Sequence, residues 1–576
     1  MMVAPWIIGL LPWWLSLPPA AGTLALGVLA GARLLPTRDA RVQRGLGTSR
    51  LLAPRRRTIP PRRPKRIHTE HIDTEAHFEG GSYPLRREAL ILGPELPASI
   101  VAPHSGALSG ASTTRERQVP LAMTRPIGPM IGTTNDGQKV FLSARDSAAG
   151  IACVGRPGSG KSVLLSNVFT WSMMERVNPS GMPGSPGRNN TLVNFETKLD
   201  GARTTLQWAH AVGDRVLLIE VANPASHAID LFAVPGSVEE RALHFTNALQ
   251  YAFADGSIRD ESFRTLKVVL TGGLVVDDDM VADIEGVAAG RSPIYYASVL
   301  MGRLGDEAGK QLATAIHAEH EKAQAAGHIA SDYSVAWESL ALLYGPTVTP
   351  SQRAGFQRAP GNKLDQLLAL EHYFAPARKK VTWSQILTGH RAVVILTGVD
   401  SAGHIMESNM EQLMSSLLMF SLRYNIERTC SGWEDQDRWV SIFADELKEL
   451  AGSTPDIITW LRNKGRSYGV RPHFATQYPE QLNMDVRDAL LSFSTLIAFT
   501  QGTPRIAREL VEDFAGDGTD WTVGDVLDLP PYHAIVRANV NYKRQSPFPF
   551  RSAYFLDEHT KQPLVEQFRA AQEPSA

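Results

Sequence analysis

The sequence predicts a mixed α/β protein with an all-helical insertion and an apolar N-terminal membrane segment. Two patterns support the α/β assignment. Short apolar runs typical of buried strands alternate with helical periodicities on either side of residues 237–385, and helical periodicities dominate within that range. Such alternation favours a parallel sheet that helices cover on both faces. The first 36 residues follow neither pattern, because they are apolar and carry no charge before Arg33.

This N-terminal stretch, residues 1–36, predicts a transmembrane segment. Its apolar runs, residues 3–17 and 20–35, are separated by Pro18-Pro19. Each run is shorter than the ~20 residues that span a bilayer, and the two together exceed that length. We therefore expect a hairpin of two short spans, with a single proline-bent span or a buried core helix as alternatives. A signal peptide is not indicated, because no basic residue precedes the apolar run.

A basic, proline-rich linker is expected in residues 37–67. Between Arg33 and Arg66 the chain carries 12 basic residues and a single acid, Asp39. Positive charge beside a membrane span marks the cytoplasmic side, and such a run can also hold anionic lipid headgroups. Direct contact of this run with DNA is a secondary alternative. Residues 68–125 have mixed charge and no long periodicity, so we expect short strands and loops that bridge the membrane segment to the body.

A sheet domain is expected in two parts, residues 126–236 and 386–557, because strand signals stop at the insertion and resume after it. The insertion, residues 237–385, contains stretches such as EERALHFTNALQYAF and KLDQLLALEHYF, which predict an all-α domain. Residues 558–576 are typical of a helix that frays into a polar tail. The strand candidates are residues 139–142, 151–154, 192–195, 215–220, 392–396, 439–443, 473–475 and 495–499.

Length and composition limit the class of protein. The 576 residues exceed one ordinary core, so two or three domains are expected. The apolar content of 43% and the charged content of 20% are those of a globular protein. A net charge of −1 argues against a strongly basic nucleic-acid coat protein but permits a local basic surface. Cys153 and Cys430 are the only cysteines, which excludes a disulfide framework or cysteine-based zinc site and suits a reducing compartment.

The octet GRPGSGKS fits the phosphate-binding pattern G-x-x-x-x-G-K-[ST], and it lies between a strand candidate and the helical run 163–174. Glycines let backbone N–H groups turn toward phosphates, and the helix N-terminus adds positive potential. Lys161 is expected to reach the β- and γ-phosphates of ATP, and the Ser162 hydroxyl to bind Mg²⁺. A chance glycine-rich turn is the alternative. The predicted nucleotide-binding residues are Gly155, Arg156, Pro157, Gly158, Ser159, Gly160, Lys161 and Ser162.

A phosphate-binding loop needs a second group for the metal, and the stretch WVSIFADE supplies carboxylates at the end of an apolar run. We expect Asp445 to hold Mg²⁺, through water, and Glu446 to act as the general base that polarises the attacking water. An Asp-Glu pair after a strand is common by chance. Its combination with the octet is what points to ATP hydrolysis.

The stretch GRSYGVRPHFATQYPEQL places a glutamine at the end of an apolar run and an arginine before that run. A buried amide is costly unless it forms hydrogen bonds, so Gln477 is expected to contact both the γ-phosphate and the lytic water from a strand between the two phosphate-contacting strands. Arg466 is expected to reach the transition-state charge of a neighbouring subunit, with Arg462 as the fallback. The alternatives are an amide that caps a loop and an arginine paired on the surface.

These motifs together resemble the HerA/FtsK superfamily of ring ATPases, and within it the TraD/TraG group, the type IV coupling proteins of bacterial conjugation. The resemblance covers about residues 125–555, and it rests on GRPGSGKS, IFADE, GRSYGVRPHFATQ, the helical insertion and the membrane segment. It implies a RecA-like P-loop ATPase core and a homo-hexamer anchored in the bacterial inner membrane. The chain departs from the family at one place. The family often has Asp-Pro-Lys-Gly there, whereas this chain has Glu196 and Lys198 and lacks the proline.

The function that this resemblance implies is ATP-driven transfer of DNA, or of a relaxase–DNA complex, through a type IV secretion channel. Its expected partners are DNA, a relaxase or relaxosome and secretion-channel proteins, and the helical insertion is expected to select cargo. A double-stranded DNA pump like FtsK is an alternative, although no winged-helix DNA reader is evident after residue 555. A protein-secretion adaptor that hydrolyses ATP without moving DNA is a second alternative.

Overall fold

The computed structural model describes residues 119–143, 146–177, 187–253, 257–450, 456–515, 521–540 and 543–553. The predicted membrane segment, basic linker and C-terminal tail lie outside these residues, as does all but the end of the predicted bridging region. Within the described ranges, no helix combines the length and the apolar character needed to cross a bilayer.

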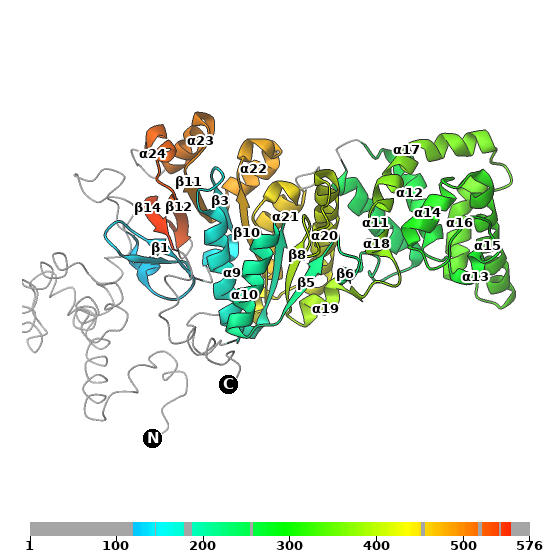
Figure 1. The fold of residues 1–576 in the computed structure, drawn as a ribbon, viewed down its shortest axis with the longest axis horizontal. Coiled ribbons are helices and arrows are strands. Elements are labelled where there is room, and N and C mark those ends of the chain that lie inside the picture. The colour runs from blue at the N-terminus through cyan, green and yellow to red at the C-terminus, as the bar shows by residue number, and fades with distance from the viewer. Residues whose placement is uncertain are drawn as a thin grey trace, which may run out of the picture.

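A large mixed sheet forms the centre of the structure (Figure 1). Its parallel strands are β3 (Ile151–Val154), β4 (Asn190–Glu196), β5 (Val216–Glu220), β8 (Ala392–Leu396), β9 (Trp439–Ala444), β10 (Val470–Thr476) and β11 (Thr495–Phe499). They lie in the order β11-β3-β10-β9-β4-β8-β5. Every strand expected from the sequence is present, and β10 is longer than expected at both ends.

Further strands extend the sheet beyond β11 as an antiparallel edge. They are β12 (His533–Val540), β14 (Phe548–Ser552), β1 (Met130–Thr133) and β2 (Lys139–Phe141), in that order, with β13 (Lys543–Arg544) paired to β12. The prediction of a parallel sheet therefore holds for the strands from β11 to β5 and is wrong for this edge. The connection between β12 and β14 is shorter than the dozen or more residues of a parallel crossover, so these two strands can pair only in antiparallel fashion.

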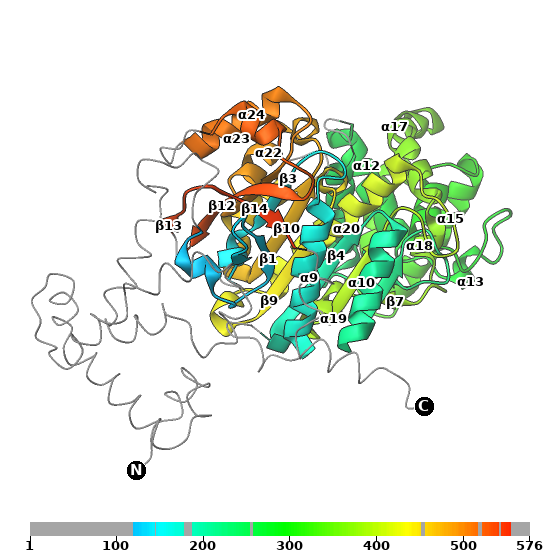
Figure 2. The same cartoon turned by 60° about the vertical axis from the view of Figure 1, so that its left-hand side comes forward.

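Helices cover both faces of the parallel part of the sheet. Successive side chains of a strand point to opposite faces, so each strand contributes to a core on either side. Ile151 of β3 packs on the face that carries α9 (Lys161–Val177) and α10 (Leu199–Val212), which lie side by side in Figure 2. Ala152 belongs to the core on the other face. The helices of that second core are α20 (Ser408–Thr429), α21 (Asp456–Asn463), α22 (Met484–Leu491) and α23 (Pro504–Ala515).

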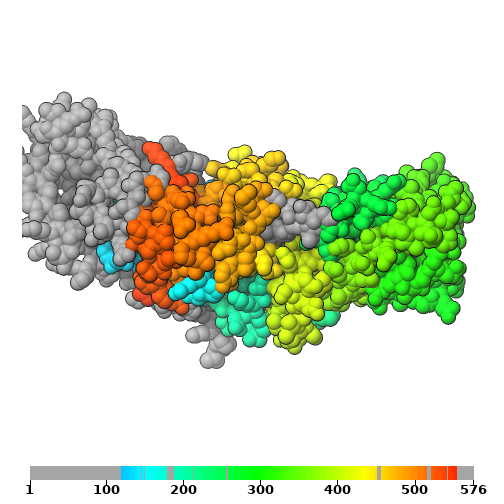
Figure 3. All heavy atoms as spheres, turned by 90° about the horizontal axis from the view of Figure 1, so that it is seen from above, coloured from blue at the N-terminus to red at the C-terminus, as the bar shows by residue number. Residues whose placement is uncertain are grey.

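Between β5 and β8 the chain forms a helical unit, which makes up one end of the elongated body in Figure 3. It is bracketed by β6 (Ala228–Ile229) and β7 (Lys380–Val381), which pair in parallel. The chain then enters β8 through α19 (Trp383–Thr388), so the predicted boundary at residue 385 falls inside this crossover helix. The helices of the unit are α11 (Val238–Ala252), α12 (Asp260–Gly273), α13 (Asp278–Val281), α14 (Pro293–Leu300), α15 (Asp306–Ala325), α16 (Asp332–Tyr344), α17 (Pro350–Leu368) and α18 (Glu371–Phe374).

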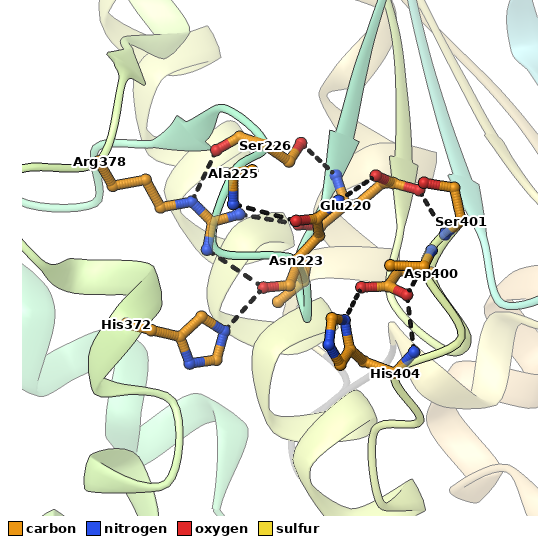
Figure 4. A network of polar contacts seen from close by, with 11 residues as sticks. Glu220, Asn223, Ala225, Ser226, His372, Arg378, Asp400, Ser401 and His404 are labelled. Carbon is orange, nitrogen blue, oxygen red and sulfur yellow. Dashed lines mark hydrogen bonds and ion pairs between the residues drawn. The ribbon is translucent and has the colours of Figure 1, made fainter.

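A buried arginine joins this helical unit to the sheet (Figure 4). Arg378, only 6% exposed, lies just before β7, and its Cζ is 4.8 Å from the ring centroid of Tyr373. Hydrogen bonds from a charged donor are stronger than neutral ones, so the Arg378 guanidinium holds the chain firmly where it leaves the end of β5. The guanidinium donates to the main-chain oxygens of Glu220 (2.7 Å), Ser226 (2.9 Å), His227 (3.2 Å) and Val221 (3.3 Å).

Candidate active site

The predicted site residues converge where three adjacent parallel strands end. The phosphate-binding loop, residues 155–162, follows β3, and the pair Asp445-Glu446 follows β9. Gln477 follows β10, which lies between β3 and β9. The expected position of the glutamine strand, β10, between β3 and β9 is therefore confirmed, and the contacts with phosphate stay a prediction. Parallel strands place their carboxyl ends at one edge of the sheet, which is where ligands bind in such folds.

The phosphate-binding loop has a conformation that depends on its glycines. Gly158 and Gly160 have φ angles of +72° and +117°, which residues with a Cβ adopt only with strain. A side chain at Gly155 would come within 2.9 Å of Ser159 Oγ. The Arg156 amide donates to Thr500 O at 2.9 Å, which ties the loop to the end of β11. This backbone path leads directly into α9, whose N-terminus is suited to anions.

Lys161 begins α9 and is folded back onto the loop. Its side chain is buried, and Nζ donates to the Arg156 carbonyl oxygen at 3.1 Å. Burial lowers the pKa of Lys161 below its ordinary value, and the nearby carboxylates of Asp445 and Glu446 oppose that change. An anionic ligand at the loop would stabilise this poorly solvated ammonium group.

Ser162 and Asp445 form a hydroxyl–carboxylate pair that could hold a divalent cation. Ser162 Oγ donates to Asp445 Oδ2 at 2.7 Å. The other oxygen, Asp445 Oδ1, is buried and has no hydrogen-bond partner within the described structure. No group of three or more His, Cys, Asp or Glu side chains in the described ranges could hold a metal ion. This donor set fits Mg²⁺, which takes one or two protein oxygens and completes its shell with phosphate oxygens and water.

Glu446 is placed to act as a base beside this pair. Thr476 Oγ1, at the end of β10, donates to Glu446 Oε1 at 3.3 Å. Burial and the charge of Asp445 raise the pKa of Glu446, whereas Lys161 opposes the rise. A carboxylate whose pKa moves toward neutral pH accepts a proton more readily, as general base catalysis requires.

Gln477 is half-buried directly after Thr476. Within the described part of the chain its amide forms no hydrogen bond, in contrast to that of Gln501 after β11. The Gln501 amide donates to Val154 O at 3.2 Å and to Phe499 O at 2.6 Å. Gln477 is thus available to a ligand, and Gln501 supports the strands around the loop.

Arg466 lies far from the phosphate-binding loop of its own chain. It precedes β10, whereas the loop is level with the carboxyl end of that strand, about 20 Å away at 3.3 Å per residue. Arg466 Nε donates to Glu434 Oε1 at 2.6 Å, and 39% of the arginine side chain is exposed. Arg462, exposed in the last turn of α21, also lies on the approach to β10. Arg466 cannot complete this site within one chain, so a role for it at a neighbouring subunit stays a prediction.

Glu196 and Lys198 lie nearer to the candidate active site than the sequence predicted. Glu196 ends β4, the strand beside β9, and Asn194 Nδ2 donates to its Oε1 at 3.0 Å. Burial chiefly raises the pKa of Glu196 to about 7, the charge of Asp445 adds to the rise, and the Asn194 bond and Lys198 oppose it. The sequence signal was only that these charges stand where the family has its Asp-Pro-Lys-Gly run.

Comparison with known proteins identifies the fold. No family model matches the chain, and no curated protein matches it. Among solved structures, it is similar to the bacterial conjugative coupling protein TrwBΔN70 in its trigonal form with sulphate. The TM-score is 0.50 at 14% identity, over 77% of this chain and 93% of that one. The chain has the P-loop fold of the coupling protein TrwB.

Two further structures show weaker similarity. TrwB in complex with ADP and Mg²⁺ has a TM-score of 0.47 at 14% identity, over 77% of this chain and 93% of that chain. VirB4 of Thermoanaerobacter pseudethanolicus has a TM-score of 0.41 at 11% identity, over 75% of this chain and 98% of that chain.

Proposed function

We propose that the chain is an ATPase that hydrolyses ATP with Mg²⁺ at the site between β3, β10 and β9. The observation that carries this proposal is the 2.7 Å contact between Ser162 of the phosphate-binding loop and Asp445 after β9. It brings together two motifs that are 283 residues apart in the sequence. The TrwB fold supports the proposal, and TrwB has been solved with ADP and Mg²⁺.

Each side chain has a distinct role in this mechanism. Lys161 binds the β- and γ-phosphates, and the N–H groups of the loop surround them. Ser162 and Asp445 hold Mg²⁺, directly or through water, and the ion neutralises charge on the phosphates. Glu446 accepts the proton of the attacking water as the bond to the γ-phosphorus forms and the bond to ADP breaks. Gln477 binds the γ-phosphate and this water, and so links the nucleotide state to residues 478–482.

We further propose that the ATPase is a membrane-anchored homo-hexamer that transfers DNA, or a relaxase–DNA complex, through a type IV secretion channel in conjugation. The support comes from the fold shared with a conjugative coupling protein and from the uncharged N-terminus followed by 12 basic residues. In such a ring the DNA motor contacts the phosphate backbone, which carries little sequence information. Arg466 then acts on the neighbouring subunit's nucleotide, because its own loop is out of reach.

The test is the ATPase rate of the full-length protein in detergent, without DNA and with single- or double-stranded DNA. A DNA motor predicts a rate that rises with DNA and is absent in Lys161→Ala. Lys310→Ala, at a half-exposed position on α15 away from the loop, is the matched control and should keep the rate. A rate that survives in Lys161→Ala would overturn the ATPase proposal. A rate that ignores both DNAs would instead favour the protein-secretion adaptor, and stimulation by double-stranded DNA alone would favour the FtsK-like pump.

A further inference from the structure

The order of the strands predicts the orientation of a nucleotide bound at the phosphate-binding loop. The groups proposed to act on the γ-phosphate follow β10 and β9, on one side of β3. On the other side of β3 lie β11 and then β12 (Figure 1). The nucleoside is at the opposite end of the triphosphate from the γ-phosphate. A nucleotide in the loop therefore extends its ribose and base toward the ends of β11 and β12.

An exposed aromatic side chain lies on that side of the loop. Tyr532 directly precedes β12 and is 47% exposed. A Cβ placed on Gly160 would be 3.0 Å from Tyr532 Cδ1 and 3.3 Å from its Cα, so the tyrosine ring lies against the loop. The ring is not part of the core packing, because nearly half of the residue faces solvent.

The backbone of Tyr532 is held in an unfavourable conformation. Its φ angle is +64°, in the left-handed region where a side chain is strained and glycine is not. Hydrogen bonds fix this conformation. The Tyr532 amide donates to Ser159 O of the phosphate-binding loop at 2.9 Å, and Ser552 N donates to Tyr532 O at 2.7 Å. Strain of this kind persists where the surroundings impose it, and it clusters at functional sites.

We propose that Tyr532 is the platform on which the nucleobase stacks. The inference rests on the proposed nucleotide-hydrolysing function and adds a residue that reads the base. Its three supports are the position beside Gly160 on the nucleoside side of β3, the exposed ring, and the strained backbone tied to the loop. Stacking uses the π-face that every base has, so the platform contributes similarly to the binding of adenine and guanine nucleotides.

The test is calorimetric titration of the full-length protein with Mg²⁺ and three probes: a non-hydrolysable ATP analogue, a non-hydrolysable GTP analogue and inorganic tripolyphosphate. Tyr532→Phe keeps the ring and should bind all three like the wild type. Tyr532→Gly and Tyr532→Ala should lose about tenfold or more in affinity for both nucleotides, as expected for a lost aromatic stack. Their affinity for tripolyphosphate, which has no base, should not change.

The glycine variant separates binding from folding. Glycine accepts a φ of +64° without strain, so Tyr532→Gly should unfold at the wild-type temperature or above it. Wild-type nucleotide affinity in Tyr532→Gly would overturn the platform while leaving the ATPase proposal intact. An equal loss for tripolyphosphate would also overturn it, because Tyr532 would then act only on the loop. Absence of all binding in the wild type would instead overturn the proposed function.

Discussion

Replacing Glu196 by glutamine should change how stability depends on pH. Burial raises the pKa of Glu196 from an ordinary 4.5 to about 7, so the folded state holds a proton that the unfolded state releases. The contribution of Glu196 to stability is therefore fully present below about pH 4.5 and is lost as the pH rises through 7. At about 1.36 kcal/mol per pH unit, the loss reaches about 3 kcal/mol as an upper limit, because the side chain keeps partial exposure.

Glutamine is uncharged at every pH and can still accept the hydrogen bond from Asn194. Glu196→Gln should thus match the wild type near pH 4 and exceed it in unfolding temperature by several degrees at pH 8, measured without nucleotide. Glu338→Gln, an exposed position on α16, is the control and should show no such difference. Parallel pH curves for Glu196→Gln and the wild type would refute the argument from burial.

Three further predictions concern the mechanism and the assembly. Glu446→Gln should bind ATP but not hydrolyse it, because only the water-activating carboxylate is lost; turnover like the wild type would exclude Glu446 as the base. Arg466→Ala should also bind ATP, but its hydrolysis rate should fall by a factor of roughly 10³. Mixed rings of Arg466→Ala and Glu446→Gln should regain activity. No recovery in rings verified by sedimentation would assign Arg466 to the surface pair with Glu434. Arg378→Met should lower stability by about 3 kcal/mol, because four main-chain oxygens, two of them in buried hydrogen bonds, lose a charged donor. Denaturant unfolding measures this, and a change under 1 kcal/mol would contradict it.

The sequence predicted the parallel strands and the phosphate-binding loop because both are local signals. A continuous apolar run such as AVVIL is buried on both faces, and a glycine-rich octet between strand and helix has few other uses. In the antiparallel edge only β2 was predicted, and β12 and β14 were missed where local signals conflict. Pro549 interrupts β14, and β12 carries the buried Arg537 among its apolar residues.

The rest of the site depends on contacts between distant segments. Glu196 looks like any glutamate in the sequence, and its raised pKa arises only when β4 packs beside β9. The distance of Arg466 from its own loop follows from the direction of β10, which no residue near Arg466 reveals. Tyr532 likewise meets Gly160 only because β12 pairs with the sheet next to β11.

The pairing of β6 with β7 brings the two ends of the helical unit together. These strands are hydrogen-bonded neighbours, so the two ends of the intervening 150 residues are about 5 Å apart. The sheet strands on either side, β5 and β8, are themselves adjacent, and α19 supplies the crossover between them. Because β6 and β7 are parallel, a crossover of about a dozen residues could close the same gap without changing the order of the sheet strands. The helical unit could thus change in length or sequence while β5 and β8 stay neighbours in the sheet.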